Sequence, residues 1–324
     1  MTIRLVTPEW PPHAGGIATW AWEAAHALHA RGERVVVHAR ATPREPSPNA
    51  PFPVVWMPGR AWARWGPVWA AASVWPAARR GDRLVFANWE MAARLVGAPG
   101  MDRLPRAVVW HGSDLTRPPR PFGRDRVRDT CVNLAVSRYL ASILGVPAEV
   151  LPAPVDVAPL AAPGDRVLVV ARLVASKGVD DAIRFAARLG RPLRVVGDGP
   201  ERPSLERLAA GLGVDAEFVG RVRRAEIPWD GAWACVSFPR AEADGSGAEG
   251  LGLVLIEAAA RGIPTIGNRC GGVPEAASVV LTRPESDEVG VFLPRDELRS
   301  RVAAAHGRER LAEALVRALD PAFG

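Results

Sequence analysis

Two basic residues in the second half of the chain have the types and spacing needed to bind phosphate. Arg172 follows an apolar run, and Lys177, the one lysine of the sequence, comes five residues later, directly before Gly178. A guanidinium can grip phosphate oxygens through paired hydrogen bonds, whereas an ammonium acts as a movable point charge. We therefore expect Arg172 and Lys177 to bind a diphosphate group; the alternative is that both are ordinary surface cations.

A glycine-rich acidic stretch nearer the C-terminus adds two carboxylates. Glu249 and Glu257 lie eight residues apart, a little over two turns of a helix, so both could face one ligand. The backbone N–H groups of Gly250, Leu251 and Gly252 would lie at the start of that helix, where anions and hydroxyl groups bind readily. Two acids with amide donors between them suit a ligand that carries both hydroxyl groups and phosphate.

The elements that must position these residues alternate between strand and helix. Apolar runs predict strands at residues 3–7, 35–39, 54–57, 84–87, 107–110, 132–136, 150–151, 166–171, 193–196, 216–219, 234–238 and 264–267. Helical periodicity predicts helices at residues 17–31, 61–78, 179–189, 200–212, 251–261 and about 296–319. This alternation is typical of α/β proteins built on doubly wound parallel sheets.

In the first half, two features follow predicted strands, at the edge where α/β sheets bind ligands. Gly15 and Gly16 separate the first strand from the first helix, which indicates either an anion site at the helix N-terminus or only a tight turn. His111 directly follows the strand at 107–110, and we expect it to face the ligand; the alternative is a structural histidine. The loop at Gly15-Gly16 does not have the dinucleotide fingerprint G-x-G-x-x-G, and no acid ends the next strand, which disfavours a nicotinamide cofactor.

A proline-rich segment divides the chain. Residues 152–164 hold four prolines and little periodicity, and a new set of strands begins at residue 166. The length of 324 residues also exceeds the usual size of one domain. We therefore expect two Rossmann-like domains, residues 1–155 and 156–324, with the glycine loop of the first opposite the acidic loop of the second across a cleft.

Three tryptophans in the first half recur at helical spacing. Trp62, Trp65 and Trp69 share one face if residues 61–78 are helical. We expect this face to pack on the sheet. The alternative is an exposed aromatic face for an apolar acceptor or a membrane surface.

Charge and composition argue against several classes of protein. The net charge is +6, but no run of five or more like charges appears, so we expect no nucleic-acid partner. No apolar stretch approaches 18 residues, and the N-terminus lacks the apolar core of a signal peptide. We expect a cytoplasmic protein, with peripheral contact at the inner membrane face left open.

The sequence has three cysteines without metal-like spacing and no Asp-x-Asp motif. We therefore expect neither a bound metal nor a cofactor.

Several short motifs at predicted strand ends together resemble one family. They are Gly15-Gly16-Ile17, His111-Gly112-Ser113-Asp114, Ser176-Lys177-Gly178-Val179-Asp180, Gly197-Asp198-Gly199-Pro200-Glu201-Arg202, Val219-Gly220, Glu249 with seven residues before Glu257, and Gly271-Gly272-Val273-Pro274-Glu275. The sequence is similar to glycosyltransferase family 4 over nearly its whole length, most strongly at residues 167–276. That family consists of retaining enzymes of the GT-B fold, in which two Rossmann-like domains face each other.

The resemblance implies a role for each candidate residue. It assigns Gly15 and Gly16 to the phosphates of a nucleotide-sugar donor, and Arg172 and Lys177 to the departing diphosphate. It assigns Glu249 to the hydroxyl groups of the donor sugar, with amides of Gly250, Leu251 and Gly252. By the same resemblance, Gly220, Arg221 and Val222 hold the base, Glu257 accepts hydrogen bonds from the ribose, and His111 approaches the reacting face of the sugar.

The implied reaction is a retaining, metal-independent transfer from a UDP- or GDP-linked sugar to a hydroxyl acceptor. It proceeds at the front face, with the leaving phosphate taking the acceptor's proton. The acceptor stays open between a saccharide, a lipid-linked acceptor and a small aglycone. The alternatives are a GT-B sugar-nucleotide epimerase, a phosphorylase, or a non-catalytic nucleotide-sugar-binding protein. Two departures stand out: a longer acidic loop between Arg240 and Glu249, and a divergent end whose last helix, in this fold, often crosses back to the first domain.

Overall fold

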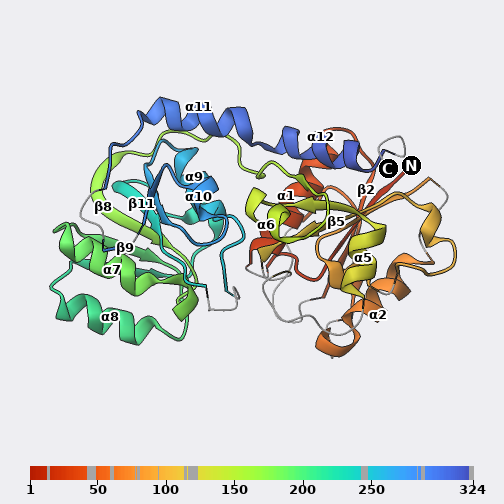
Figure 1. The fold of residues 1–324 in the computed structure, drawn as a ribbon, viewed down its shortest axis with the longest axis horizontal. Helices are drawn as coiled ribbons and strands as arrows, with labels where there is room; N and C mark the ends of the chain where they lie inside the picture. Colours follow the sequence, from red (N-terminus) through yellow and green to blue (C-terminus); the bar gives the residue numbers. More distant parts are fainter. Residues whose placement is uncertain are drawn as a thin grey trace. The chain divides into compact units, whose positions relative to one another are not determined.

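The structure of the chain is a computed structural model (Figure 1) that describes residues 1–12, 15–41, 49–58, 62–76, 78, 81–93, 95–112, 115, 123–241, 247–282, 284–285 and 289–320. The side chains of residues 62–64, 67 and 102 also lie outside this description. The chain forms two compact units. The first unit is Met1–Pro154 with His306–Gly324, and the second is Val155–Ala305.

The first unit is built on a parallel sheet of seven strands in the order β3-β2-β1-β4-β5-β6-β7. These strands are β1 (Ile3–Thr7), β2 (Val35–Arg40), β3 (Val54–Met57), β4 (Arg83–Phe86), β5 (Arg106–Trp110), β6 (Val132–Ala135) and β7 (Glu149–Val150). Its helices are α1 (Gly16–Ala30), α2 (Trp62–Val74), α3 (Trp89–Ala92), η1 (Met101–Arg103), α5 (Arg124–Thr130), α6 (Arg138–Ile143) and α12 (Arg308–Ala318).

Alternate residues of these strands supply two cores, one on each face of the sheet. Leu5 and Val85 belong to the core that includes residues of α1 and α12. Their neighbours Val6 and Phe86 belong to the core that includes residues of α2 and α3. Successive side chains of a strand point to opposite faces, so a central strand buried on both sides needs an unbroken apolar run. This requirement explains the apolar pairs Leu5-Val6 of β1 and Val85-Phe86 of β4, whereas Arg4 of β1 is buried with its Nε donating to Asp82 Oδ2 at 2.8 Å.

The second unit is built on a parallel sheet of six strands in the order β10-β9-β8-β11-β12-β13. These strands are β8 (Pro163–Val170), β9 (Leu193–Val196), β10 (Ala216–Gly220), β11 (Ala232–Ser237), β12 (Thr265–Asn268) and β13 (Val279–Leu281). Its helices are η2 (Ala175–Lys177), α7 (Val179–Arg188), α8 (Arg202–Gly211), η3 (Arg224–Glu226), α9 (Leu253–Ala259), α10 (Val273–Ala276) and α11 (Arg295–Ala305). The predicted fold class, two Rossmann-like units with parallel sheets, is confirmed.

The C-terminal stretch differs from the single helix expected at about residues 296–319. It forms two helices, α11 and α12, with His306 and Gly307 between them. Leu311 and Leu315 of α12 are buried in the core of the first unit. The Arg308 Nε atom lies 2.5 Å from Glu23 Oε2 on α1. The second unit therefore ends at Ala305, and the chain passes between the units twice.

The tryptophan-bearing helix α2 is only partly packed on the sheet. Trp69 is partly buried against the first unit's core, whereas the side chain of Trp65 is 45% exposed. The side chain of Trp62 lies outside the described residues. The expectation that this face packs on the sheet therefore holds for Trp69 and is wrong for Trp65. Within the described part of the chain, no helix combines the length and apolar character that crossing a membrane requires.

Candidate functional site

The strongest contact among the predicted site residues joins Lys177 to Glu249. Lys177 ends η2, the short turn between β8 and α7, and Glu249 lies in the loop before α9. The Nζ atom donates to Glu249 Oε2 at 2.5 Å, with both side chains about one quarter exposed. The predicted phosphate cation and the predicted hydroxyl-binding acid therefore lie side by side, accessible to a ligand from solvent.

Arg172, the second predicted phosphate cation, follows β8 in the same connection. Its side chain is exposed and forms no ion pair within the described ranges. Its carbonyl oxygen accepts from the Val174 backbone N–H at 3.0 Å, which folds the chain toward η2. Arg172 and Lys177 are thus on one short connection, and no contact between their side chains is needed for both to meet an anion.

A glycine at the start of α7 lets β11 approach this turn. Gly178 has φ +58°, and a Cβ atom there would lie 1.9 Å from the carbonyl oxygen of Phe238. Only glycine adopts this conformation without strain, and any side chain would also collide with the backbone. The Ser-Lys-Gly sequence therefore brings the end of β11 against the turn that carries Lys177.

The glycine pair after β12 supports the acidic loop. The Gly272 backbone N–H donates to the Glu249 carbonyl oxygen at 2.8 Å. A Cβ atom at Gly271, where φ is +60°, would lie 2.1 Å from that same oxygen. The Gly271-Gly272 motif therefore positions the backbone of Glu249, which explains why a remote glycine turn belongs to the site.

Glu257 faces a different cation from Glu249. It is buried on α9, and its carboxylate forms an ion pair with Arg224 of η3, the turn after β10. Helix α9 begins only at Leu253, with Gly252 at φ +86° before it. The helix predicted at 251–261 is therefore shorter, and helical spacing does not relate Glu249 to Glu257. Leu251 and Gly252 are buried and Gly250 is half-buried, between the two acids.

Charged and aromatic groups surround the Glu257 carboxylate. Burial, and secondarily the charge of Glu257, raises the pKa of the Cys235 thiol. Burial lowers the pKa of Arg261, against the attraction of Glu257. The Arg261 guanidinium lies over the Trp229 ring, 4.7 Å from its centroid. Glu257 thus belongs to a partly desolvated polar cluster, where hydrogen bonds to a carboxylate are stronger than in water.

The predicted base-binding residues lie beside this cluster in sequence. Gly220 ends β10, and its carbonyl oxygen accepts from the Gly197 backbone N–H at 2.8 Å. Arg221 is exposed and Val222 is half-buried, two residues before Arg224. Sequence reasoning missed Arg224, because one arginine in an arginine-rich chain gives no local signal. Arg224 closely follows the residues predicted to bind the base, and its ion pair with Glu257 links that turn to the residue predicted to bind the ribose.

The remaining predicted residues belong to the first unit. Gly15 precedes α1 and Gly16 is its first residue, with the Thr19 N–H donating to the Gly15 carbonyl at 3.0 Å. His111 directly follows β5, and its buried ring lies edge-on to Trp20 of α1, with centroids 5.4 Å apart. Burial lowers the pKa of His111 to about 4, so its imidazole is neutral at pH 7.

A metal site is not apparent in the described residues. No group of three or more His, Cys, Asp or Glu side chains among them is arranged to hold a metal ion. Cys131, Cys235 and Cys270 are buried free thiols. Metal independence stays a prediction, since it concerns the reaction and not only the resting protein.

Solved structures share this fold over almost the whole chain. AviGT4, a glycosyltransferase involved in avilamycin A biosynthesis, matches with a TM-score of 0.71 at 22% identity, covering 98% of this chain and 96% of that one. HepE of Anabaena, crystallised in complex with UDP, matches with a TM-score of 0.71 at 16% identity, covering 98% and 99%. The fold is therefore the GT-B fold of glycosyltransferases, as predicted.

The similarity to a known family covers most of the second unit and the helix α12. Residues 164–319, a little under half of the chain, match the family described as Glycosyl transferases group 1, and through this segment the chain is similar to that family. The GDP-mannose-dependent alpha-(1-6)-phosphatidylinositol monomannoside mannosyltransferase of Mycolicibacterium smegmatis is 40% identical over 123 residues. The matched stretch covers 35% of this chain and 32% of that relative, so the chain aligns with only about a third of its length.

Proposed function

We propose that this protein is a retaining glycosyltransferase that moves a sugar from a nucleoside diphosphate sugar to a hydroxyl acceptor. The observation that carries the proposal is the 2.5 Å contact between Lys177 and Glu249, inside the segment that matches the family. In this proposal Lys177 binds the donor phosphate and Glu249 accepts hydrogen bonds from the sugar hydroxyl groups, so their contact supports one shared donor site. A donor whose sugar is attached directly to a diphosphate needs that juxtaposition.

The charges of the site suit the changes of charge during transfer. As the sugar leaves, negative charge grows on the diphosphate and positive charge on the sugar ring. Lys177 and Arg172 stabilise the departing diphosphate more than the intact donor, which lowers the barrier. Glu249 orients the sugar, and a leaving phosphate oxygen accepts the proton of the acceptor hydroxyl. Because the two cations meet the diphosphate charge, the reaction proceeds without a metal.

The donor nucleotide is UDP or GDP. The mycobacterial relative is named for GDP-mannose, and HepE was crystallised with UDP, so the likenesses support a nucleoside diphosphate and leave the base open. For the acceptor we propose a lipid-linked sugar or alcohol. The relative's name includes phosphatidylinositol monomannoside, and Trp56, Trp65 and Trp75 of the first unit are 44–48% exposed, which suits an apolar acceptor or membrane surface.

The sequence offers a direct test of donor binding, because Lys177 is its one lysine. An amine-specific reagent can modify only Lys177 and the N-terminal amine. We expect UDP or GDP to protect Lys177 from modification while the N-terminal amine reacts at an unchanged rate. Inorganic phosphate at the same concentration serves as the control for simple charge screening. Equal labelling of Lys177 with and without every nucleoside diphosphate would refute the proposed donor site.

Turnover assays separate the proposal from its rivals. A transferase releases the nucleoside diphosphate from the matching nucleotide sugar and does so faster with acceptor present. An epimerase converts the donor without acceptor, and a phosphorylase requires inorganic phosphate. Nucleotide protection of Lys177 without any turnover would instead identify a binding protein. Comparing UDP- and GDP-sugars, with and without lipid acceptors, distinguishes these outcomes.

A further inference from the structure

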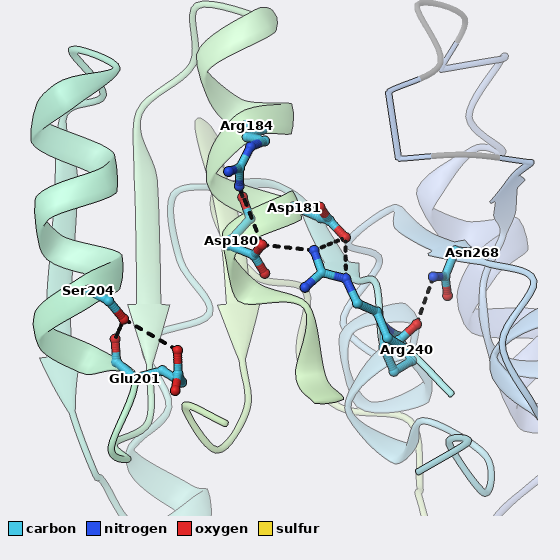
Figure 2. A network of polar contacts seen from close by, with 8 residues as sticks. Asp180, Asp181, Arg184, Glu201, Ser204, Arg240 and Asn268 are labelled. Carbon is cyan, nitrogen blue, oxygen red and sulfur yellow. Dashed lines mark hydrogen bonds and ion pairs between the residues drawn. The ribbon is translucent and has the colours of Figure 1, made fainter. Parts of the chain in front are cut away.

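An arginine outside the predicted donor contacts connects β11 to the first turn of α7 (Figure 2). The Arg240 Nη2 atom lies 2.8 Å from Asp180 Oδ2, and its Nε donates to Asp181 Oδ2 at 3.0 Å. The Arg240 backbone N–H donates to the Ser176 carbonyl at 2.9 Å. The preceding carbonyl, of Pro239, accepts from Asn268 Nδ2 at 2.8 Å. Backbone and side chain of Arg240 are thus both fixed.

This junction adjoins, in sequence, both residues of the Lys177–Glu249 contact. Ser176, which accepts from Arg240, directly precedes Lys177. A Cβ atom at Gly247 would lie 3.3 Å from the Arg240 carbonyl oxygen and 3.8 Å from the Ser176 Cβ, so Gly247 also belongs to the junction. Gly247 is two residues before Glu249. Both ends of the ion pair are therefore within two residues of a group that contacts this junction.

The charge arrangement explains why an arginine is required at this place. Asp180 and Asp181 are adjacent carboxylates three and four residues after Lys177, close in sequence to the predicted diphosphate site. Arg240 pairs with both, and its planar fork can engage two carboxylates at fixed angles, which a lysine cannot do. Arg184 pairs with Asp180 from within the same helix and makes no link to β11. Removing Arg184 therefore takes a cation from Asp180 only, whereas removing Arg240 also breaks the link between α7 and the end of β11.

We propose that Arg240 is a positioning residue for donor chemistry. By tying the end of β11 to the first turn of α7, it sets the loop that carries Glu249 against the turn that carries Lys177. The catalytic part of this inference rests on the proposed function; the part concerning the Lys177–Glu249 contact does not. Each end of the contact also has its own support: the Lys177 N–H donates to the Val174 carbonyl at 2.9 Å, and the Glu249 carbonyl accepts from the Gly272 N–H at 2.8 Å. Loss of the tie therefore changes how the two segments lie against each other, and with it the contact between the two side chains, rather than the turn that carries Lys177.

The kinetic experiment compares Arg240→Ala with Arg184→Ala, which removes the same charge beside the same Asp180. We expect Arg240→Ala to lower kcat/KM for the donor at least tenfold, while the Kd of the free nucleoside diphosphate changes less than threefold. Arg240→Lys should fall between wild type and alanine. Arg184→Ala should change both quantities less than twofold. Unchanged turnover in folded Arg240→Ala, or an equal loss in Arg184→Ala, overturns the proposal.

A second experiment follows the contact without any substrate. Reductive methylation with a ¹³C label marks only Lys177 and the N-terminal amine, and Glu249→Gln gives the Lys177 signal of a broken ion pair. We expect the Lys177 signal of Arg240→Ala to move toward that of Glu249→Gln, and the signal of Arg184→Ala to stay at the wild-type position. If Arg240→Ala does not fold, Asp181→Asn, which weakens the same tie without changing shape, takes its place. A wild-type signal in the tested variant refutes the tie, whereas absence of turnover in wild type refutes only the proposed function.

Discussion

The Nζ atom of Lys177 lies 2.5 Å from the Glu249 carboxylate although 72 residues separate them in sequence. If both groups act on one donor, Lys177→Ala and Glu249→Ala should each lower kcat/KM by roughly 10²–10³, the loss seen when one transition-state contact is removed. The double variant should lose much less than the product, because the two groups act as a unit. Steady-state kinetics on folded proteins, verified by circular dichroism, measures this. Fully multiplicative losses would show that the two side chains act independently.

The ribose contact expected for Glu257 predicts selectivity for a ribonucleotide. Glu257→Gln should reduce the preference for a ribonucleoside diphosphate over its 2′-deoxy analogue about tenfold, since a carboxylate binds a hydroxyl donor more strongly than a neutral amide does. Isothermal titration with both ligands measures the ratio of the two Kd values. The same preference in wild type and variant would show that Glu257 does not contact the ribose.

Removing the partner cation of Glu257 should cost stability. Arg224→Ala takes one cation from a buried carboxylate, and we expect Tm to fall by several degrees. Arg223→Ala is the matched control, because Arg223 is the adjacent arginine, its side chain is 85% exposed, and it pairs with exposed Glu226. Differential scanning calorimetry of the two variants tests the difference. Equal Tm values would mean that the Glu257 pair contributes no more than a surface pair.

Two glycines, one at each end of α7, allow the free-energy cost of a steric collision to be measured apart from the cost of backbone strain. Gly178 and Gly190 have nearly equal φ angles, +58° and +59°, but only at Gly178 would a Cβ meet another backbone atom. Gly190→Ala should cost about 1–2 kcal/mol, or roughly 2–4 °C in Tm per kcal/mol. Gly178→Ala should cost clearly more, because β11 must move away from η2. Similar Tm losses in the two variants would show that the approach of Phe238 is easily relaxed.

The first unit should lose stability as the pH falls below 6.5. Burial lowers the pKa of both His38 and His111 to about 4. For His38, the positive charge of Arg4 lowers the pKa further. Between pH 6.5 and 4 the unfolded chain binds protons at these sites and the folded chain does not, so stability present above pH 6.5 is lost toward pH 4. Each histidine contributes up to about 3 kcal/mol.

The second unit provides the internal control for this pH effect, because all six histidines lie outside residues 155–305. Hydrogen exchange between pH 7 and 5, corrected for the intrinsic exchange rate, should show weakened protection in the first unit and little change in the second. His111→Gln should reduce the effect in the first unit. Uniform behaviour of both units would contradict a histidine origin.

The regular elements could be predicted because their signals are local. The strand at residues 193–196 was predicted with the bounds of β9, and both parallel sheets follow from the alternation of apolar runs. β13, with three residues, is too short for periodicity to reveal. Arg224 and Arg240 could not be identified as important from the sequence, because their ion-pair partners lie 33 and 60 residues away. Burial of His111, and exposure of Trp65 on a helix of the expected period, likewise depend on tertiary packing.

The return of α12 to the first unit makes the second unit an insertion within the first. The two crossing points are neighbours: the Gly307 N–H donates to the Ala153 carbonyl at 3.0 Å, and the Ala153 N–H donates to His306 Nδ1 at 3.2 Å. An exchange of the second unit between relatives therefore needs two cuts, near residues 154 and 306. A chimera spliced once would give α1 a foreign α12 to pack against, whereas one spliced twice would keep that helix pair native.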